Sequence, residues 1–205
     1  KIISNLKINK IYLNWFININ KRSNKNWKEK HTKGGGIIFN YICHSIYYLE
    51  SLFGKITSVK TNIFFKKKEG IQILKGIIFF ENDLSAKLNV LTGPIKSKVN
   101  PTHQLKILSN QKTYVLETDL NSLSDKFKLI TFSKNSNKLG KILSRSKKNQ
   151  NDFRIKPTFI NSKKFSDWIL KGKIQKPSFF DAKRIHLIIN KMIISSKQKR
   201  EIYIN

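Results

Sequence analysis

The sequence predicts an α+β fold, in which one open, mainly antiparallel β-sheet carries helices on one of its faces. Short runs rich in β-branched and aromatic residues fill the middle of the chain, and turn-forming residues separate them at hairpin spacing. One apolar helix pattern precedes these runs and two helix patterns follow them, as expected for helices layered on a sheet. Because the chain has 205 residues, 39% of them hydrophobic, we expect a single domain over 1–205.

The expected elements begin with a strand and a buried helix. Isoleucine and aromatic residues predict a strand at 8–19, and an almost wholly apolar pattern predicts a helix at 36–53 that stops at Gly54. Hairpin-linked strands are expected next, at 55–65, 70–82, 84–92, 103–109, 112–118 and 126–133. The basic, Ser- and Asn-rich segment 134–157 predicts a mobile loop.

Two helices and a short strand are expected to close the chain. The first helix is expected after Pro157. The second has Ser178 three residues before Asp181, which is the spacing of a capping box. Its apolar residues recur at the spacing of one helix face: Ile185, Ile188, Ile189, Met192 and Ile193. The final strand is expected at residues 201–205.

The chain is strongly basic, with 41 lysines and arginines against 12 acidic residues and a formal net charge of +29. Clustered cations are typical of proteins that bind nucleic acid or another polyanion. An A/T-rich coding sequence also overproduces Lys, Asn and Ile, and these are the residue types in excess here. Base recognition depends on the arginine fork, and arginine is scarce. We therefore favour coding bias, and nucleic acid is not the expected partner.

The sequence also argues against a disulfide, a metal site and a membrane-spanning segment. The lone cysteine, Cys43, cannot form an intramolecular disulfide, so we expect a reducing, cytoplasmic setting. His31, His103 and His186 have no acidic residue or cysteine nearby at metal-binding spacing, so no metal site is expected. No apolar run approaches the roughly 20 residues that cross a bilayer, so no membrane partner is expected.

A run of three glycines, Gly34, Gly35 and Gly36, leads into the expected buried helix. Glycines that open a helix can cradle a phosphate, but this run matches neither of the nucleotide-binding glycine patterns and no βαβ unit follows. The spacing favours structural glycines that allow a turn with positive φ and a close backbone approach.

The helix that follows carries a polar stripe. Asn40 and His44 are four residues apart and so lie on one helix face, and Ser51 with one of Tyr47 or Tyr48 extends this stripe. Polar groups on an otherwise apolar helix are costly unless they are satisfied. The stripe is therefore expected to line a cleft or to meet polar partners, although a buried histidine is more often a hydrogen-bonded core residue than a catalyst.

The segment from Trp27 and Lys28 through the three glycines and the Asn40-x-x-x-His44 pattern to Gly54 resembles the C-terminal domain of the Gfo/Idh/MocA oxidoreductases. This is the family of glucose–fructose oxidoreductase and inositol dehydrogenase. "GIIFFENDLSAKLNV" is similar to the family's strand–turn–strand element, and "SFFDAKRIHLIINKMIISSKQKREIYI" to its closing helix and strand. The resemblance spans essentially the whole chain.

The resemblance implies a fold like the C-terminal domain of dihydrodipicolinate reductase and a domain for substrate binding and oligomerisation. It implies an NAD(P)-dependent oxidoreductase acting on a hydroxyl of a sugar, cyclitol or nucleotide sugar. His44 would be the catalytic proton carrier and Asn40 its support, with Trp27, Lys28 and Tyr48 binding the substrate. NAD or NADP would be held mainly by an N-terminal Rossmann domain, which this sequence lacks and without which it is not competent. Homo-oligomers would form through the open sheet face.

One departure from the family leaves alternatives open. The family's usual aspartate is Asn40 here, which can orient an imidazole but cannot stabilise its positive charge. An inactive structural domain is therefore one alternative. A basic module that binds nucleic acid or another polyanion through its lysine-rich loops is the other.

Overall fold

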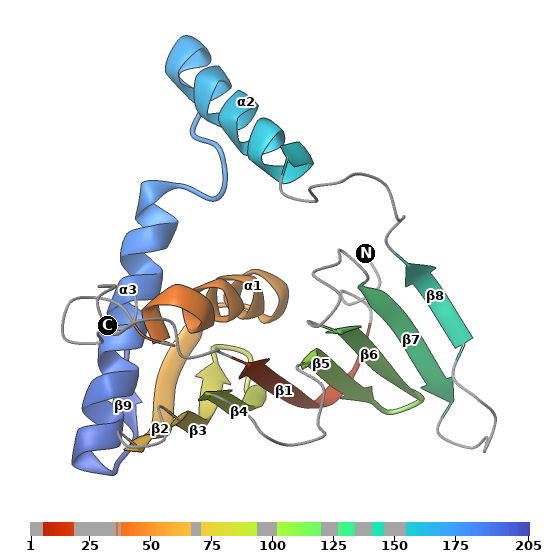
Figure 1. The fold of residues 1–205 in the computed structure, drawn as a ribbon, viewed down its shortest axis with the longest axis vertical. Helices are drawn as coiled ribbons and strands as arrows, with labels where there is room; N and C mark the ends of the chain where they lie inside the picture. Colours follow the sequence, from red (N-terminus) through yellow and green to blue (C-terminus); the bar gives the residue numbers. More distant parts are fainter. Residues whose placement is uncertain are drawn as a thin grey trace.

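The computed structural model describes residues 6–18, 36, 38–66, 71–93, 102–119, 127–133, 141–145 and 155–205. A nine-stranded sheet runs through them in the order β8-β7-β6-β5-β1-β4-β3-β2-β9 (Figure 1). The strands are β1 (Ile8–Asn18), β2 (Ile56–Lys66), β3 (Ile71–Phe80), β4 (Ser85–Gly93), β5 (Thr102–Ser109), β6 (Lys112–Asp119), β7 (Lys128–Ser133), β8 (Lys141–Arg145) and β9 (Ile202–Tyr203).

The helical elements are a π-helical turn, η3 (Ile38–Ile42), and the helices α1 (Cys43–Phe53), α2 (Ile155–Lys171) and α3 (Phe179–Gln198). Helices α1 and α3 lie against the sheet, and α2 stands apart from it (Figure 1). The predicted α+β class, with its open and mainly antiparallel sheet, is confirmed. None of the described helices is both long enough and apolar enough to cross a membrane.

The expected run of hairpins is interrupted at the centre of the sheet. β1 pairs antiparallel with β5 on one side and parallel with β4 on the other. A parallel pair needs a long crossover connection, and α1 with the β2–β3 hairpin supplies it here. Sequence patterns alone predict strands but not this insertion, because pairing partners depend on the whole chain.

The two faces of the sheet differ in chemistry because side chains alternate along each strand. The helix-covered face carries a buried core that includes Ile11 and Leu13 of β1, Leu74 and Ile78 of β3, and Ile188 of α3. We call the other side the open face; it carries Tyr12 and Asn14 of β1, for example, and Lys75 of β3. The core is thus confined to one layer between sheet and helices.

Helix α3 begins at the predicted capping box. The Ser178 hydroxyl accepts a hydrogen bond from the Asp181 backbone N–H at 3.2 Å, and the Asp181 carboxylate accepts one from the Ser178 N–H at 2.7 Å. These hydrogen bonds to Ser178 lower the pKa of Asp181. The helix start was therefore predictable from local chemistry alone.

Near its end, α3 also satisfies the outer edge of β2. Beyond the short partner β9, the backbone N–H of Thr61 donates to the Ser195 hydroxyl at 3.0 Å, and that of Ile63 donates to the Ser196 hydroxyl at 2.8 Å. Close contact is possible because Gly76 lies opposite Thr61. A Cβ on Gly76 would come within 2.6 Å of the Thr61 methyl group. Two serines thus attach α3 to the sheet, and the missing side chain at Gly76 leaves room for Thr61.

The helix and loop boundaries differ from the sequence-based expectations at two places. The loop expected at 134–157 is wrong at its centre, because β8 (Lys141–Arg145) forms there and pairs with β7. The alternating pattern of this short strand is difficult to recognise in the sequence because lysines and serines surround it. Helix α2 starts at Ile155 instead of after Pro157, since proline is tolerated in the first helical turn. The other residues of 134–157 lie outside the described part of the chain.

Candidate functional site

The candidate site is built on the first helical segment after the glycine run. Gly36 has φ of +82°, in the left-handed region that favours glycine. The π-helical turn η3 follows and continues into α1. Single π turns are rare and are often found at functional sites. Asn40 lies in this turn and His44 in the first turn of α1.

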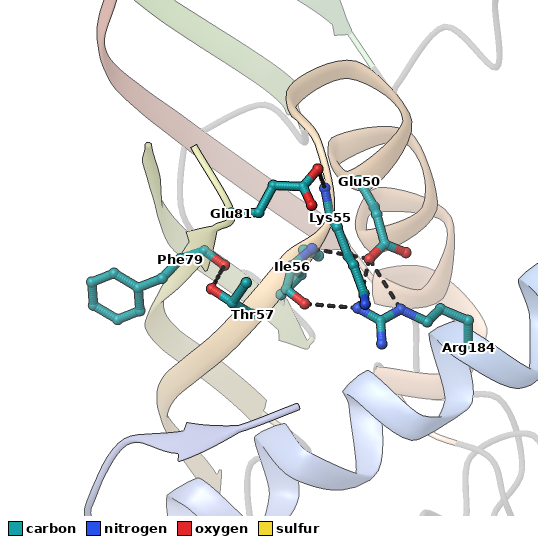
Figure 2. A network of polar contacts seen from close by, with 7 residues as sticks. All are labelled: Glu50, Lys55, Ile56, Thr57, Phe79, Glu81 and Arg184. Carbon is teal, nitrogen blue, oxygen red and sulfur yellow. Dashed lines mark hydrogen bonds and ion pairs between the residues drawn. The ribbon is translucent and has the colours of Figure 1, made fainter. Parts of the chain in front are cut away.

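The C-terminal end of α1 is fixed by a partly buried ion pair. The Arg184 guanidinium of α3 donates to one Glu50 carboxylate oxygen at 3.1 and 3.2 Å, and to the backbone carbonyl of Ile56 at 2.7 Å (Figure 2). The same Glu50 oxygen accepts the Ile56 N–H at 3.0 Å. One arginine therefore joins α1, the start of β2 and α3.

The turn between α1 and β2 is fixed from the other side by the β3–β4 turn. The backbone N–H of Lys55 donates to the Glu81 carboxylate at 3.0 Å (Figure 2), and the Asn82 amide donates to the last helical carbonyl, that of Phe53, at 2.9 Å. Gly54 ends the helix with φ of +101°. Helix α1 is thus anchored at the end opposite His44, which sets the orientation of its side chains.

The predicted site residues occupy different environments. The His44 side chain is exposed to solvent, Asn40 is half-buried in η3, and Tyr48 is half-buried one helical turn after His44. The spacing of His44 and Tyr48 places them on the same face of α1. The other predicted residues, Trp27, Lys28, Gly34 and Gly35, lie outside the described residues.

Tyr48 is engaged with a residue from the sheet. Its hydroxyl lies 3.1 Å from Nε2 of His103 on β5, and the imidazole tautomer sets which atom donates. Burial lowers the pKa of His103 to about 4 and raises the pKa of the Tyr48 hydroxyl well above its ordinary value. At neutral pH this pair is therefore uncharged, so it can hold a polar group by hydrogen bonding but is not suited to take up a proton.

Aromatic rings surround His103. The Trp15 ring from β1 meets it edge-on at a centroid distance of 4.8 Å, and the Phe127 ring does so at 6.1 Å. Tyr41 of η3 packs edge-on against Trp15 at 5.8 Å. Nδ1 of His103 and Nε1 of Trp15 are buried with no hydrogen-bond partner in the described structure. Leaving such buried atoms without a partner costs about 1–3 kcal/mol each.

Sequence reasoning treated His103 only as a rejected metal ligand and missed its place beside Tyr48. A signal was present, because the strand pattern at 103–109 puts His103 on the same face as the apolar Leu105 and Ile107. A histidine on a buried face needs a partner. The identity of that partner depends on the packing of α1 over β5, which the local sequence does not encode.

The described residues lack the groups that usually hold a metal ion or a dinucleotide. They include no group of three or more histidine, cysteine or acidic side chains that could hold a metal ion. They also lack a glycine-rich turn between a parallel strand and a helix, the usual cradle of a dinucleotide pyrophosphate. The described residues therefore do not fit a dinucleotide by themselves, and what they offer is a polar, partly exposed helix face.

Comparison with protein families agrees with this arrangement. Residues 6–124, more than half of the chain, match the family model GFO_IDH_MocA_C, described as the oxidoreductase family, C-terminal alpha/beta domain. No curated protein matches the sequence.

Solved structures share the fold at low sequence identity. Levoglucosan dehydrogenase in complex with NADH is 13% identical with a TM-score of 0.71, and the match covers 97% of this chain and 59% of that one. The transcriptional regulator Gal80p from Kluyveromyces lactis is 17% identical with a TM-score of 0.73, with 96% and 55% covered. An NAD-binding protein from Listeria innocua is 15% identical with a TM-score of 0.63, with 94% and 54% covered.

The chain thus spans little more than half the length of these structures, and at such identities the likeness concerns the fold alone. The family match over residues 6–124 and the observed sheet both correspond to the C-terminal domain of the family. The chain belongs to the Gfo/Idh/MocA family of oxidoreductases, of which it is a C-terminal α/β domain.

Proposed function

We propose that this domain provides the substrate-binding and proton-transfer side of an NAD(P)-dependent oxidoreductase. The substrate would carry a hydroxyl of a sugar, cyclitol or nucleotide sugar. The observation that supports the proposal most is the exposed His44 on a helix anchored by Glu50 and Arg184. Oxidation of a hydroxyl requires a group that takes its proton, and imidazole is the side chain most often used for this.

The neighbouring residues have roles that follow from their environments. Because burial lowers the pKa of His103 to about 4, this imidazole is a weak base, and the proton-accepting role is proposed for the exposed His44. Tyr48, held by His103, would hydrogen-bond the substrate beside it. Trp27 and Lys28 are proposed as further substrate contacts on the basis of the family resemblance.

NAD or NADP is the proposed cofactor, bound mainly by a Rossmann domain outside this chain. Two solved structures with this fold support the substrate class by their contents: levoglucosan dehydrogenase was solved with NADH and levoglucosan, and also with NADH and L-sorbose. We also propose a homo-oligomer that forms through the open face. A cytoplasmic location is proposed from the lone Cys43.

The proposal predicts a specific defect when His44 is replaced in the full-length enzyme. His44→Gln should lower kcat by about 100- to 10,000-fold, because the hydroxyl proton loses its acceptor, while the KM for the cofactor stays unchanged. Steady-state kinetics with NAD, NADP and a panel of sugars would measure both. His186→Gln, which removes an exposed histidine from α3, is the matched control and should retain activity. Equal kcat for His44→Gln and the wild type would reject the assignment.

A domain without catalytic activity is the second candidate, and Asn40 is the observation that favours it. The fold is shared by a dehydrogenase and by a transcriptional regulator, so it does not decide between them. The Asn40→Asp variant separates the two candidates. In an enzyme, the added carboxylate near His44 should raise kcat, whereas in a non-catalytic domain neither the wild type nor the variant would oxidise any sugar tested.

A further inference from the structure

Helix α2 carries an apolar stripe that no other part of the described structure covers. Ile155, Phe159, Ile169 and Leu170 recur at the spacing of one helix face, and their side chains are between 61% and 78% exposed. We call these four residues the α2 stripe. A large apolar surface that faces water on a folded protein marks a place where a partner binds.

The apolar surface continues from the α2 stripe toward the start of α3. Phe165 lies one helical turn before Ile169 and lines a hollow of about 310 Å³ together with Trp168 and Phe179. The rings of Trp168 and Phe179 lie 6.1 Å apart, so they join the end of α2 to the beginning of α3. A hollow beside an apolar stripe fits a protein surface, because a projecting side chain can fill it.

Helix α2 and the candidate site lie on one side of the sheet. Figure 1 shows α2 on the side that α1 and α3 cover, farther from the sheet than α1. His44 is exposed on α1. A cofactor that reacts with a substrate beside His44 has to approach the substrate to about 3–3.5 Å. The domain that holds the cofactor must therefore occupy this side of the sheet.

Related structures contain a part that has no counterpart in this chain. The match to levoglucosan dehydrogenase covers 97% of this chain but only 59% of the dehydrogenase. The matching family model describes a C-terminal domain. A further domain is thus available in proteins of this fold to cover a surface that this domain leaves exposed.

A second copy of the chain and a lipid bilayer fit the α2 stripe less well. Pairing of two copies along α2 would bring their exposed Lys163 and Lys171 side chains together, in a chain with a net charge of +29. A bilayer binds a helix through a continuous apolar face, whereas Ser162 and Ser166 interrupt the middle of this face. Both serines are small enough to let another protein element approach closely.

We infer that the α2 stripe docks against the cofactor-binding domain of the same polypeptide, and that the hollow beside Trp168 receives one of that domain's side chains. The inference rests on the proposed function, because that proposal supplies the domain. Docking there holds the cofactor domain on the same side of the sheet as His44.

Hydroxyl-radical footprinting of the wild-type full-length protein tests whether the stripe is covered. Leu170 is 78% exposed in this domain, whereas Leu187 on α3 is 36% exposed and serves as the matched leucine. Docking should make the oxidation of Leu170 at least about threefold slower than that of Leu187. Faster oxidation of Leu170, the order of their exposures in this domain, would overturn the inference.

A photo-crosslink identifies what covers the stripe. With p-benzoylphenylalanine in place of Phe159, irradiation of the full-length protein should link α2 to a peptide of the cofactor domain within one chain. The control places the same group at Lys171, which is exposed on the opposite face of α2, and should give no such link. A crosslinked dimer, or protection of Leu170 that requires anionic lipid vesicles, would overturn the inference in favour of a second copy or a membrane.

These measurements do not depend on catalysis, so the docking and the proposed function can fail separately. A protected Leu170 together with full kcat in His44→Gln would support the docking and reject the role of His44. An exposed Leu170 in an active enzyme that His44→Gln inactivates would overturn the docking alone.

Discussion

His103 is a histidine that the fold keeps neutral. Its side chain is 7% exposed, and burial lowers its pKa to about 4 from an ordinary value near 6.5. The unfolded chain therefore takes up a proton below about pH 6.5, while the folded chain does so only near pH 4. The stabilisation from a neutral His103 is fully present above pH 6.5 and is lost as the pH falls toward 4.

This linkage predicts that the free energy of unfolding falls by about 3 kcal/mol between pH 6.5 and 4 through His103 alone. Denaturant unfolding across this range would measure it, as the difference between the wild type and His103→Gln. The Tyr48→Phe variant should keep the full pH dependence, because burial and not the tyrosine hydrogen bond is the main cause of the shift. A His103→Gln variant with the wild-type slope would contradict the assignment.

At the residue scale, the sequence-based predictions were most accurate for interactions between residues that are close together in the chain. Ser178 and Asp181 form the expected capping box because their partners are three residues apart. His44 was identified from its flanking segment, and its role stays a proposal. The environment of His103 could not be predicted, since it depends on Trp15 and Tyr48, which lie far away in the chain.

At the scale of elements, the contact between α3 and β2 is open to a direct test. Ser195 is fully buried, accepts the Thr61 N–H and donates to the Arg200 carbonyl at 2.6 Å. Ser195→Ala should lower the free energy of unfolding by about 1–3 kcal/mol, because a buried N–H loses its partner. Chemical denaturation measures this loss.

Ser196→Ala is the matched control for that experiment. Ser196 is half-buried and accepts the N–H of Ile63, where water can replace the hydroxyl. Its loss should therefore cost less than that of Ser195. Equal stability of Ser195→Ala and the wild type would show that the serine does not hold the β2 edge.

Most elements were predicted within a few residues of their observed bounds, because alternation and helical periodicity mark them. The failures have physical causes. β8 is short and surrounded by lysine and serine, so its pattern is weak. The π turn η3 depends on a backbone adjustment that apolar periodicity does not record. The parallel β1–β4 pair is a property of topology and not of any one segment.

At the scale of the whole molecule, the proposed oligomer would cover the open face, which carries exposed lysines. Face-to-face pairing would bring Lys60, Lys75 and Lys87 of two copies together, so association should strengthen as salt screens their repulsion. Sedimentation of the full-length protein at about 0.05 M and 0.5 M salt would test this. Lys75→Gln/Lys87→Gln should associate equally well at both concentrations.

Two outcomes would count against pairing through the open face. One is a stable monomer at every salt concentration. The other is an oligomer whose affinity does not respond to salt or to the lysine substitutions, since this would place the interface elsewhere. At this scale the sequence predicted the fold class and the family, both of which are confirmed, while the parallel centre of the sheet became apparent only in the structure.

The position of β1 has a consequence for how the protein folds. β2 to β4 form one set of local hairpins and β5 to β8 form another, and in the described sheet β1 is the strand that joins them (Figure 1). β1 leaves the ribosome before either set, yet it pairs with residues about 75 to 100 positions later. During synthesis both edges of β1 therefore stay unpaired until β4 and β5 have been made. Each of these pairings closes a far longer loop than the hairpins within the two sets do, so we expect the joining of β1 to slow folding.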